Sequence, residues 1–170
     1  MARSSVKKWI ISVLGLAALC AVLVWWGWPL ALAAMGLHPP LEEPNLAMEG
    51  RRALIIATSH NTLDPSDEET GVFLSELTAP YYTLRDAGVE VDIASIEGGP
   101  VPVDPSSFDW TVISSWDQRY LDDPQLYSRV QRSFAIGQVD VTSYDIVFLA
   151  GGWGAAYDFA QSKTLSDKIS

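Results

Sequence analysis

Three glycines and a tryptophan, Gly151-Gly152-Trp153-Gly154, directly follow the apolar run Tyr144–Ala150. Glycines after a buried parallel strand let the backbone approach a ligand closely, and their N–H groups can face an anion or a developing oxyanion. In open α/β sheets, ligands bind beyond the carboxyl ends of the strands. A tight turn that needs positive φ is the alternative. A dinucleotide fingerprint is not indicated, because GxGxxG does not occur.

Two side chains that we expect near the carboxyl ends of the strands could transfer protons. Glu76 lies in the segment GVFLSEL, on a helix after the first strand, and His60 lies in TSHN, just after that strand. Either could act in acid–base chemistry, although a surface glutamate and a solvated loop histidine are the simpler alternatives. We count His60 and Trp153 as candidate ligand-binding residues. Asp64 and Asp67 near His60 lack a second His or Cys at ligand spacing, so we expect no metal and no cofactor.

The pattern around these residues predicts alternating strands and helices. The continuous apolar run Ala53–Thr58 suits a strand buried on both faces. Apolar residues then recur at helical spacing from Thr70, and Gly88 suits the end of that helix. Val89–Ala94 alternates apolar and acidic residues, as expected of a strand near a sheet edge. Together with the run Tyr144–Ala150, these segments predict an α/β fold with a parallel sheet.

Other segments are less regular. We expect residues 97–121 to be irregular, with Trp110 and Trp116 packed beneath them, because this stretch is rich in Pro, Gly and Asp. A helix is predicted from Pro124 to about Phe134, and another from Ser162 to Ile169.

The N-terminal segment predicts a membrane anchor. Trp9–Trp28 is a run of twenty residues in which Ser12 is the only polar side chain, and a helix of that length spans about 30 Å, the thickness of a hydrocarbon core. Three basic residues precede the run, which places the N-terminus in the cytoplasm and the following domain on the outer, periplasmic or extracellular, side. A cleaved signal peptide ending near Ala31-Leu32-Ala33 is the alternative.

The resulting organisation is a basic segment at 1–8, a transmembrane anchor at 9–34 in contact with the lipid bilayer, a Pro-rich linker at 35–50 and an α/β domain at 51–170. Of the 11 basic and 21 acidic residues, three of each lie in residues 1–50, so the domain carries the net charge of −10. Such an acidic domain repels phosphate backbones, which argues against nucleic acid as a partner.

Taken in order, ALIIATSH, TGVFLSELTAPYYTLRDAGVEVDIASIEGGPVPVDPSS and YDIVFLAGGWGAAYDF resemble the DJ-1/PfpI superfamily. The similarity is greatest to its Hsp31-like branch, which has the class I glutamine amidotransferase-like, flavodoxin-like fold. The resemblance implies that Glu76 matches the glutamate beside the family's cysteine nucleophile and acts as a proton shuttle. It also implies that Gly151 and Gly152 border the active site and offer a backbone N–H to an oxyanion. Many Hsp31-like members have His at the position of Trp153.

The family's activities include glutathione-independent glyoxalase chemistry, hydrolase claims and chaperone function, so the resemblance implies a small reactive carbonyl as substrate, and many relatives are homodimers. Its nucleophile stands on an elbow after the helix that begins here near Ser162. Cys20 is the only cysteine and lies in the apolar N-terminal run. We therefore expect a membrane-anchored domain truncated before that elbow and inactive as written. The alternatives are a non-enzymatic, membrane-tethered binding or chaperone-like module, and a non-functional fragment.

Overall fold

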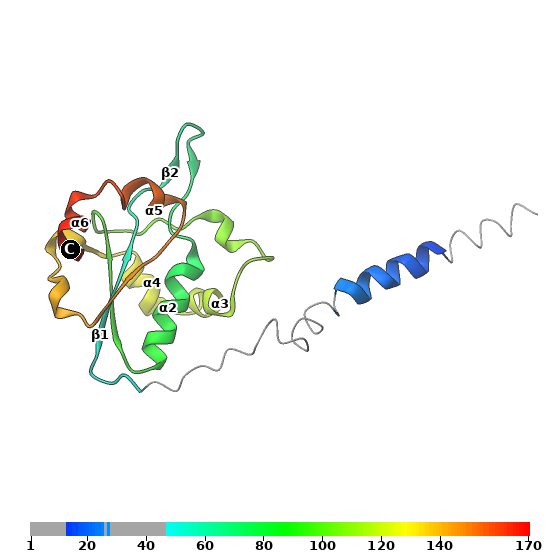
Figure 1. The fold of residues 1–170 in the computed structure, drawn as a ribbon, viewed down its shortest axis with the longest axis horizontal. Coiled ribbons are helices and arrows are strands. Elements are labelled where there is room, and N and C mark those ends of the chain that lie inside the picture. Colours follow the sequence, from blue (N-terminus) through cyan, green and yellow to red (C-terminus); the bar gives the residue numbers. More distant parts are fainter. Residues whose placement is uncertain (1–12, 26, 28–46) are drawn as a thin grey trace, which may run out of the picture. The chain divides into compact units, whose positions relative to one another are not determined.

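The computed structural model describes residues 13–25, 27 and 47–170. The chain divides into two units, Met1–Pro44 and Asn45–Ser170, and each is described by itself. The second unit contains the α/β fold and all of the candidate site residues (Figure 1).

The N-terminal unit corrects the predicted membrane anchor. Residues 13–25 are helical. Within the described residues, no helix has the length and apolar character needed to cross a membrane. The transmembrane helix at 9–34, the bilayer contact of Trp9–Trp28 and the single-pass location with an outer domain were therefore wrong predictions for this part of the chain. Residues 9–12, 26 and 28–34 of that prediction lie outside the described residues.

The second unit is built on a parallel sheet in the strand order β5-β4-β1-β6. The strands are β1 (Arg52–Ala57), β4 (Glu90–Ser95), β5 (Phe134–Ala135) and β6 (Ile146–Leu149). β1 pairs in parallel with β4 on one side and with β6 on the other. Its central position explains its continuous apolar sequence, because both faces of β1 are covered. The predicted α/β fold with a parallel sheet is confirmed.

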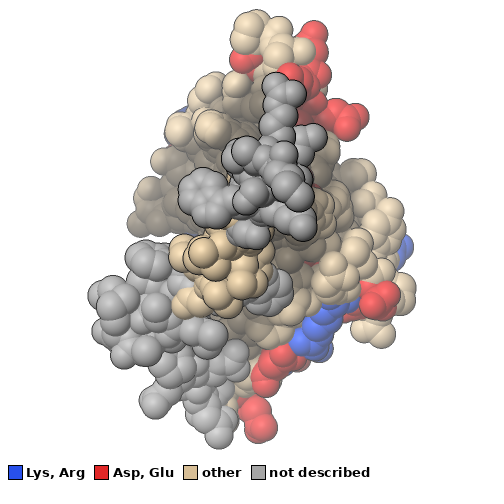
Figure 2. All heavy atoms as spheres, turned by 90° about the vertical axis from the view of Figure 1, so that its right-hand side faces the viewer, with Lys and Arg blue, Asp and Glu red and all other residues tan. Residues whose placement is uncertain are grey.

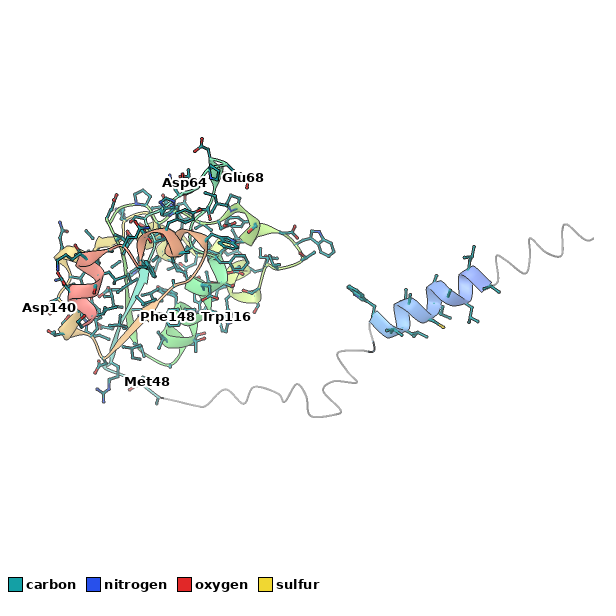
Figure 3. All side chains as sticks on the ribbon, turned by 45° about the horizontal axis from the view of Figure 1, so that its top comes forward. Met48, Asp64, Glu68, Trp116, Asp140 and Phe148 are labelled. Carbon is teal, nitrogen blue, oxygen red and sulfur yellow. The ribbon has the colours of Figure 1, made fainter. Side chains whose placement is uncertain are left out.

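A short antiparallel hairpin, β2 (Thr62–Leu63) and β3 (Glu68–Glu69), follows β1. In Figure 1, β1 runs upward, and the hairpin and α5 (Trp153–Asp158) lie at its upper end. Figure 3 shows Asp64 and Glu68 together on this hairpin, far from Met48 at the other end of the domain. The carboxyl end of β1 is therefore the end that carries the candidate site.

One face of the sheet is covered by α2 (Leu74–Asp86), α3 (Ser115–Leu121) and α4 (Pro124–Val130). Alternate residues of β1, such as Ile55, pack there against Leu77, Tyr82 and Leu126. α2 ends where the sequence predicts, because Gly88 follows it with φ +87°.

The other face is covered by α6 (Lys163–Ile169) and the 3-10 turn Ile136–Gln138. Leu54 and Ile56 of β1 pack there against Ile136 and Leu165. The acidic side chains on the face seen in Figure 2 form separate groups and not one continuous patch.

The stretch 97–121 is more ordered than its composition predicts. It contains the 3-10 helix Pro105–Phe108 and α3, whose N-cap Ser114 forms a reciprocal capping box with Asp117. Trp116 packs against the core, but the indole of Trp110 is 86% exposed, so the prediction that both lie buried was wrong for Trp110. α4 ends at Val130, earlier than predicted, because Phe134 joins the sheet as part of β5.

Two backbone segments cross at the carboxyl end of the sheet, one before α2 and one after β6. The Phe73 N–H donates to the Gly151 carbonyl at 3.1 Å, and the Gly154 N–H donates to the Gly71 carbonyl at 3.1 Å. Gly152 has φ +138°, and a Cβ there would lie 2.6 Å from both the Gly71 carbonyl oxygen and the Phe73 nitrogen. Only glycine meets both requirements at position 152.

Replacing Gly152→Ala should lower the free energy of unfolding by at least about 2 kcal/mol, because the methyl group must displace backbone and the φ is unfavourable. Urea denaturation followed by circular dichroism measures this. Gly137→Ala is the matched control, since its added Cβ meets only Thr164 Cγ2 at 3.5 Å. If both variants lost the same free energy of unfolding, the close backbone crossing would not be the reason for the loss in Gly152→Ala.

The buried phenol of Tyr120 makes stability sensitive to alkaline pH. Burial raises the pKa of Tyr120 to about 12, with a further contribution from Tyr127, above about 10 for an unfolded chain. Between these values the unfolded state loses its proton first, so the free energy of unfolding should fall as pH rises from about 10 to about 12. Tyr120→Phe should reduce this fall without abolishing it, because burial also raises the pKa of Tyr81 and Tyr82. Urea denaturation at about pH 8 and about pH 11 checks this, and an identical fall in both proteins would contradict it.

Candidate functional site

The candidate residues lie in loops that leave the carboxyl ends of the two neighbouring strands β1 and β6. Thr58–Asn61 follows β1, and Ala150–Gly152 follows β6 before α5 begins at Trp153. This edge of a parallel sheet is where open α/β folds bind ligands, because the loops there diverge and leave backbone groups free.

Glu76 of α2 lies against Gly151 of the loop after β6. A Cβ built on Gly151 would lie 3.5 Å from Glu76 Oε2 and 3.7 Å from its Cδ, so the carboxylate is in contact range of the glycine. Glu76 stands in the first turn of α2, and the bond from Phe73 to Gly151 fixes the start of that helix. The carboxylate is exposed, so it is accessible to a ligand above the glycines.

Hydrogen bonds to residues 104 and 107 also hold the start of α2. The Ser107 hydroxyl accepts from the Leu74 N–H at 3.0 Å, and Asp104 accepts from the Thr70 hydroxyl at 2.8 Å. Burial alone would raise the pKa of Asp104, but hydrogen bonds from Ser106 and Thr70 outweigh it and lower that pKa. Asp104 is therefore held as a carboxylate, and it anchors the segment from which Glu76 projects.

The backbone N–H groups of Gly151 and Gly152 are free to bind a ligand. Among the described residues, neither donates a hydrogen bond to a backbone or side-chain acceptor. Free N–H groups beside a carboxylate can hold a carbonyl oxygen as it gains negative charge while the carboxylate moves a proton. Trp153, the next residue, has an indole that is 66% exposed.

His60 belongs to a different group of residues. Its ring stacks on Tyr157 of α5 with centroids 4.5 Å apart and an interplanar angle of 8°. The structure thus brings Glu76, Gly151 and Gly152 together and places His60 with α5. No set of three or more His, Cys, Asp or Glu side chains positioned to hold a metal occurs in residues 47–170 or in the described part of the N-terminal helix.

Asp158 is a site residue that sequence reasoning missed. Its Oδ2 accepts from the Thr58 hydroxyl and from the Ser59 N–H, both at 2.8 Å, which ties α5 to the loop after β1. The sequence interpretation took the glycines after β6 as a ligand-binding loop, with a tight turn as the alternative, and did not predict α5. An aspartate on a six-residue helix carries no periodic signal that distinguishes it from a surface residue.

Comparison with known proteins identifies the relatives of this fold. No protein-family profile matches the chain. A glutathione-independent glyoxalase of Schizosaccharomyces pombe is 26% identical over 120 residues, covering 69% of this chain and 50% of the relative. A second one, from Saccharomyces cerevisiae, is 29% identical over 123 residues, covering 71% of this chain and 52% of the relative. The chain thus spans about half the length of the curated relatives it matches.

Solved structures agree. The 24 kDa rapid encystment protein of Francisella tularensis superposes with a TM-score of 0.65 at 34% identity, covering 70% of this chain and 52% of that chain. Glyoxalase III of Candida albicans, at 24% identity, shares the fold with a TM-score of 0.62, covering 70% of this chain and 51% of that one. By sequence and by fold, the chain is a homologue of the Hsp31-like glutathione-independent glyoxalases of the DJ-1/PfpI superfamily.

Proposed function

We propose that the domain carries the proton-transfer and oxyanion-binding part of a glyoxalase-type active site for small reactive carbonyl compounds. The observation that carries this proposal is the contact between the Glu76 carboxylate and Gly151. This contact supports an acid–base role for Glu76 next to the loop that carries the N–H groups of Gly151 and Gly152, and the isomerisation of a 2-oxoaldehyde needs both kinds of group. The relatives named as glutathione-independent glyoxalases support the same chemistry.

The proposed reaction starts from a thiol adduct of a 2-oxoaldehyde such as methylglyoxal. A thiolate adds to the aldehyde carbon and forms a hemithioacetal. Glu76 then takes the proton from that carbon and returns it to the neighbouring carbon, which converts the hemithioacetal to the thioester of a 2-hydroxy acid. The negative charge that develops on oxygen between these two steps is stabilised by the N–H groups of Gly151 and Gly152.

The thiol does not come from the described α/β domain. Residues 51–170 contain no cysteine, and Cys20 is the only one in the sequence. The role proposed for this domain is therefore limited to the steps after thiol addition. A small thiol added from solution can supply the adduct, so these steps are testable on the chain itself.

With methylglyoxal and 2-mercaptoethanol, the chain should form lactoyl thioester faster than buffer does. Glu76→Gln should slow this by about a hundredfold or more, to the rate in buffer, because it removes the group that moves the proton. Ultraviolet absorbance of the thioester measures the rate.

Glu90→Gln is the matched control, because this glutamate is exposed and stands at the opposite, amino end of β4. Its rate should equal that of the wild type. A rate unchanged by Glu76→Gln would remove Glu76 from the mechanism. A wild-type rate equal to that of buffer would contradict the proposal for the domain as a whole.

A further inference from the structure

A hollow of about 370 Å³ lies at the same edge of the sheet, and Glu76 does not line it. It lies between the loop after β1, the hairpin and α5, and its polar lining includes His60, Asp64, Tyr157, Asp158 and Ser162. In Figure 3 the labelled Asp64 marks the hairpin side of this region. Nothing in the proposed carbonyl chemistry uses this hollow.

Two polar atoms of the hollow's lining residues are buried without a partner. Within the described residues, His60 Nε2 and Asp158 Oδ1 are the buried side-chain atoms for which no hydrogen bond is found. A buried carboxylate oxygen that is left unpaired destabilises the folded protein, because it has lost its hydrogen bonds to water without gaining others. That two such atoms occur together, on residues lining one hollow, indicates a place where a ligand supplies the missing hydrogen bonds.

Neither side chain is free to turn away and find another partner. Asp158 is fixed through Oδ2 by the Thr58 hydroxyl and the Ser59 N–H. The His60 ring is fixed by its parallel stack on Tyr157, whose hydroxyl donates to the Asp64 carbonyl at 3.4 Å. The two unpaired atoms are therefore preorganised, as the polar groups of a binding site are.

The charge of the lining selects the ligand. Two carboxylates, Asp64 and Asp158, line the hollow, and none of the lining residues is Lys or Arg. A carboxylate oxygen only accepts, and the Nε2 of a neutral imidazole accepts when Nδ1 carries the proton. A metal ion is disfavoured because the described residues offer no set of three suitable ligands.

We propose that this hollow binds a small organic cation with several N–H donors, of the guanidinium or alkylammonium class. One N–H donates to Asp158 Oδ1 and another to His60 Nε2, which satisfies both buried atoms with a single group. The site is separate from the proposed carbonyl chemistry, so either proposal can fail without the other.

Calorimetric titration of the full 170-residue chain with methylguanidinium tests the proposal. Saturable binding is expected, together with a saturable shift of the His60 ring resonance in NMR spectra. Tetramethylammonium, which has the same charge but no N–H donor, should not saturate the site. Titration with N-acetylargininamide distinguishes an arginine side chain of a polypeptide from a free small cation as the ligand. Tighter binding than methylguanidinium would indicate an arginine side chain of a polypeptide, and weaker binding would indicate a free small cation.

His60→Phe keeps a ring on Tyr157 but removes Nε2, and Asp158→Asn removes the charge while keeping the shape. Each should weaken methylguanidinium binding about tenfold. Asp167→Asn is the control, because this exposed aspartate pairs with Lys163 on α6 and does not line the hollow, so the affinity of this variant for methylguanidinium should be unchanged.

Asp158 also supports the loop after β1, so the decisive variant is His60→Phe, with its fold checked by circular dichroism. Unchanged affinity in a folded His60→Phe protein would overturn the proposal. Equal binding of tetramethylammonium and methylguanidinium would also overturn it, because binding would then not depend on N–H donors in the ligand.

Discussion

The close crossing of two backbone segments at the carboxyl end of the sheet is the contact on which the candidate site depends. Gly71 and Gly152 approach so closely that a side chain on Gly152 would overlap the neighbouring backbone. Two hydrogen bonds, from Phe73 to Gly151 and from Gly154 to Gly71, hold the crossing together. The start of α2 and the start of α5 are thereby fixed relative to each other. Glu76 is placed by the first of these helices and Asp158 by the second.

The two helix starts divide the edge of the sheet into two chemically different regions. On the α2 side an exposed carboxylate stands beside glycines whose N–H groups are free, an arrangement suited to holding an oxygen and moving a proton. On the α5 side the polar groups are buried, and Asp158 and His60 each keep an unpaired atom. The first region is the one for which we propose a transient charge during a reaction, and the second is the one for which we propose a bound cation that supplies lasting hydrogen bonds.

The residues that hold the start of α2 in place lie within residues 97–121, a segment whose composition predicts a loop. Asp104 and Ser107 hold the segment before α2, and Asp117 on α3 accepts from the buried Thr78 hydroxyl of α2 at 2.6 Å. A loop with buried polar groups of this kind is stable only when each group has its partner. Residues 97–121 therefore hold in place α2, the helix that carries Glu76.

Local sequence patterns were enough to predict the helices and strands whose own apolar spacing reflects how they are buried. The apolar run of β1 and the helical spacing of α2 predicted both elements. The roles that the resemblance implies for Glu76, Gly151 and Gly152 stay predictions. The long apolar N-terminal run predicted a membrane-spanning helix, but within the described residues no helix has the length and apolar character to cross a membrane. α5, the role of Asp158 and the separation of His60 from Glu76 required the tertiary structure. The physical reason is that the bond from Thr58 to Asp158 joins residues 100 positions apart, and no pattern within one element contains information about a partner at that distance.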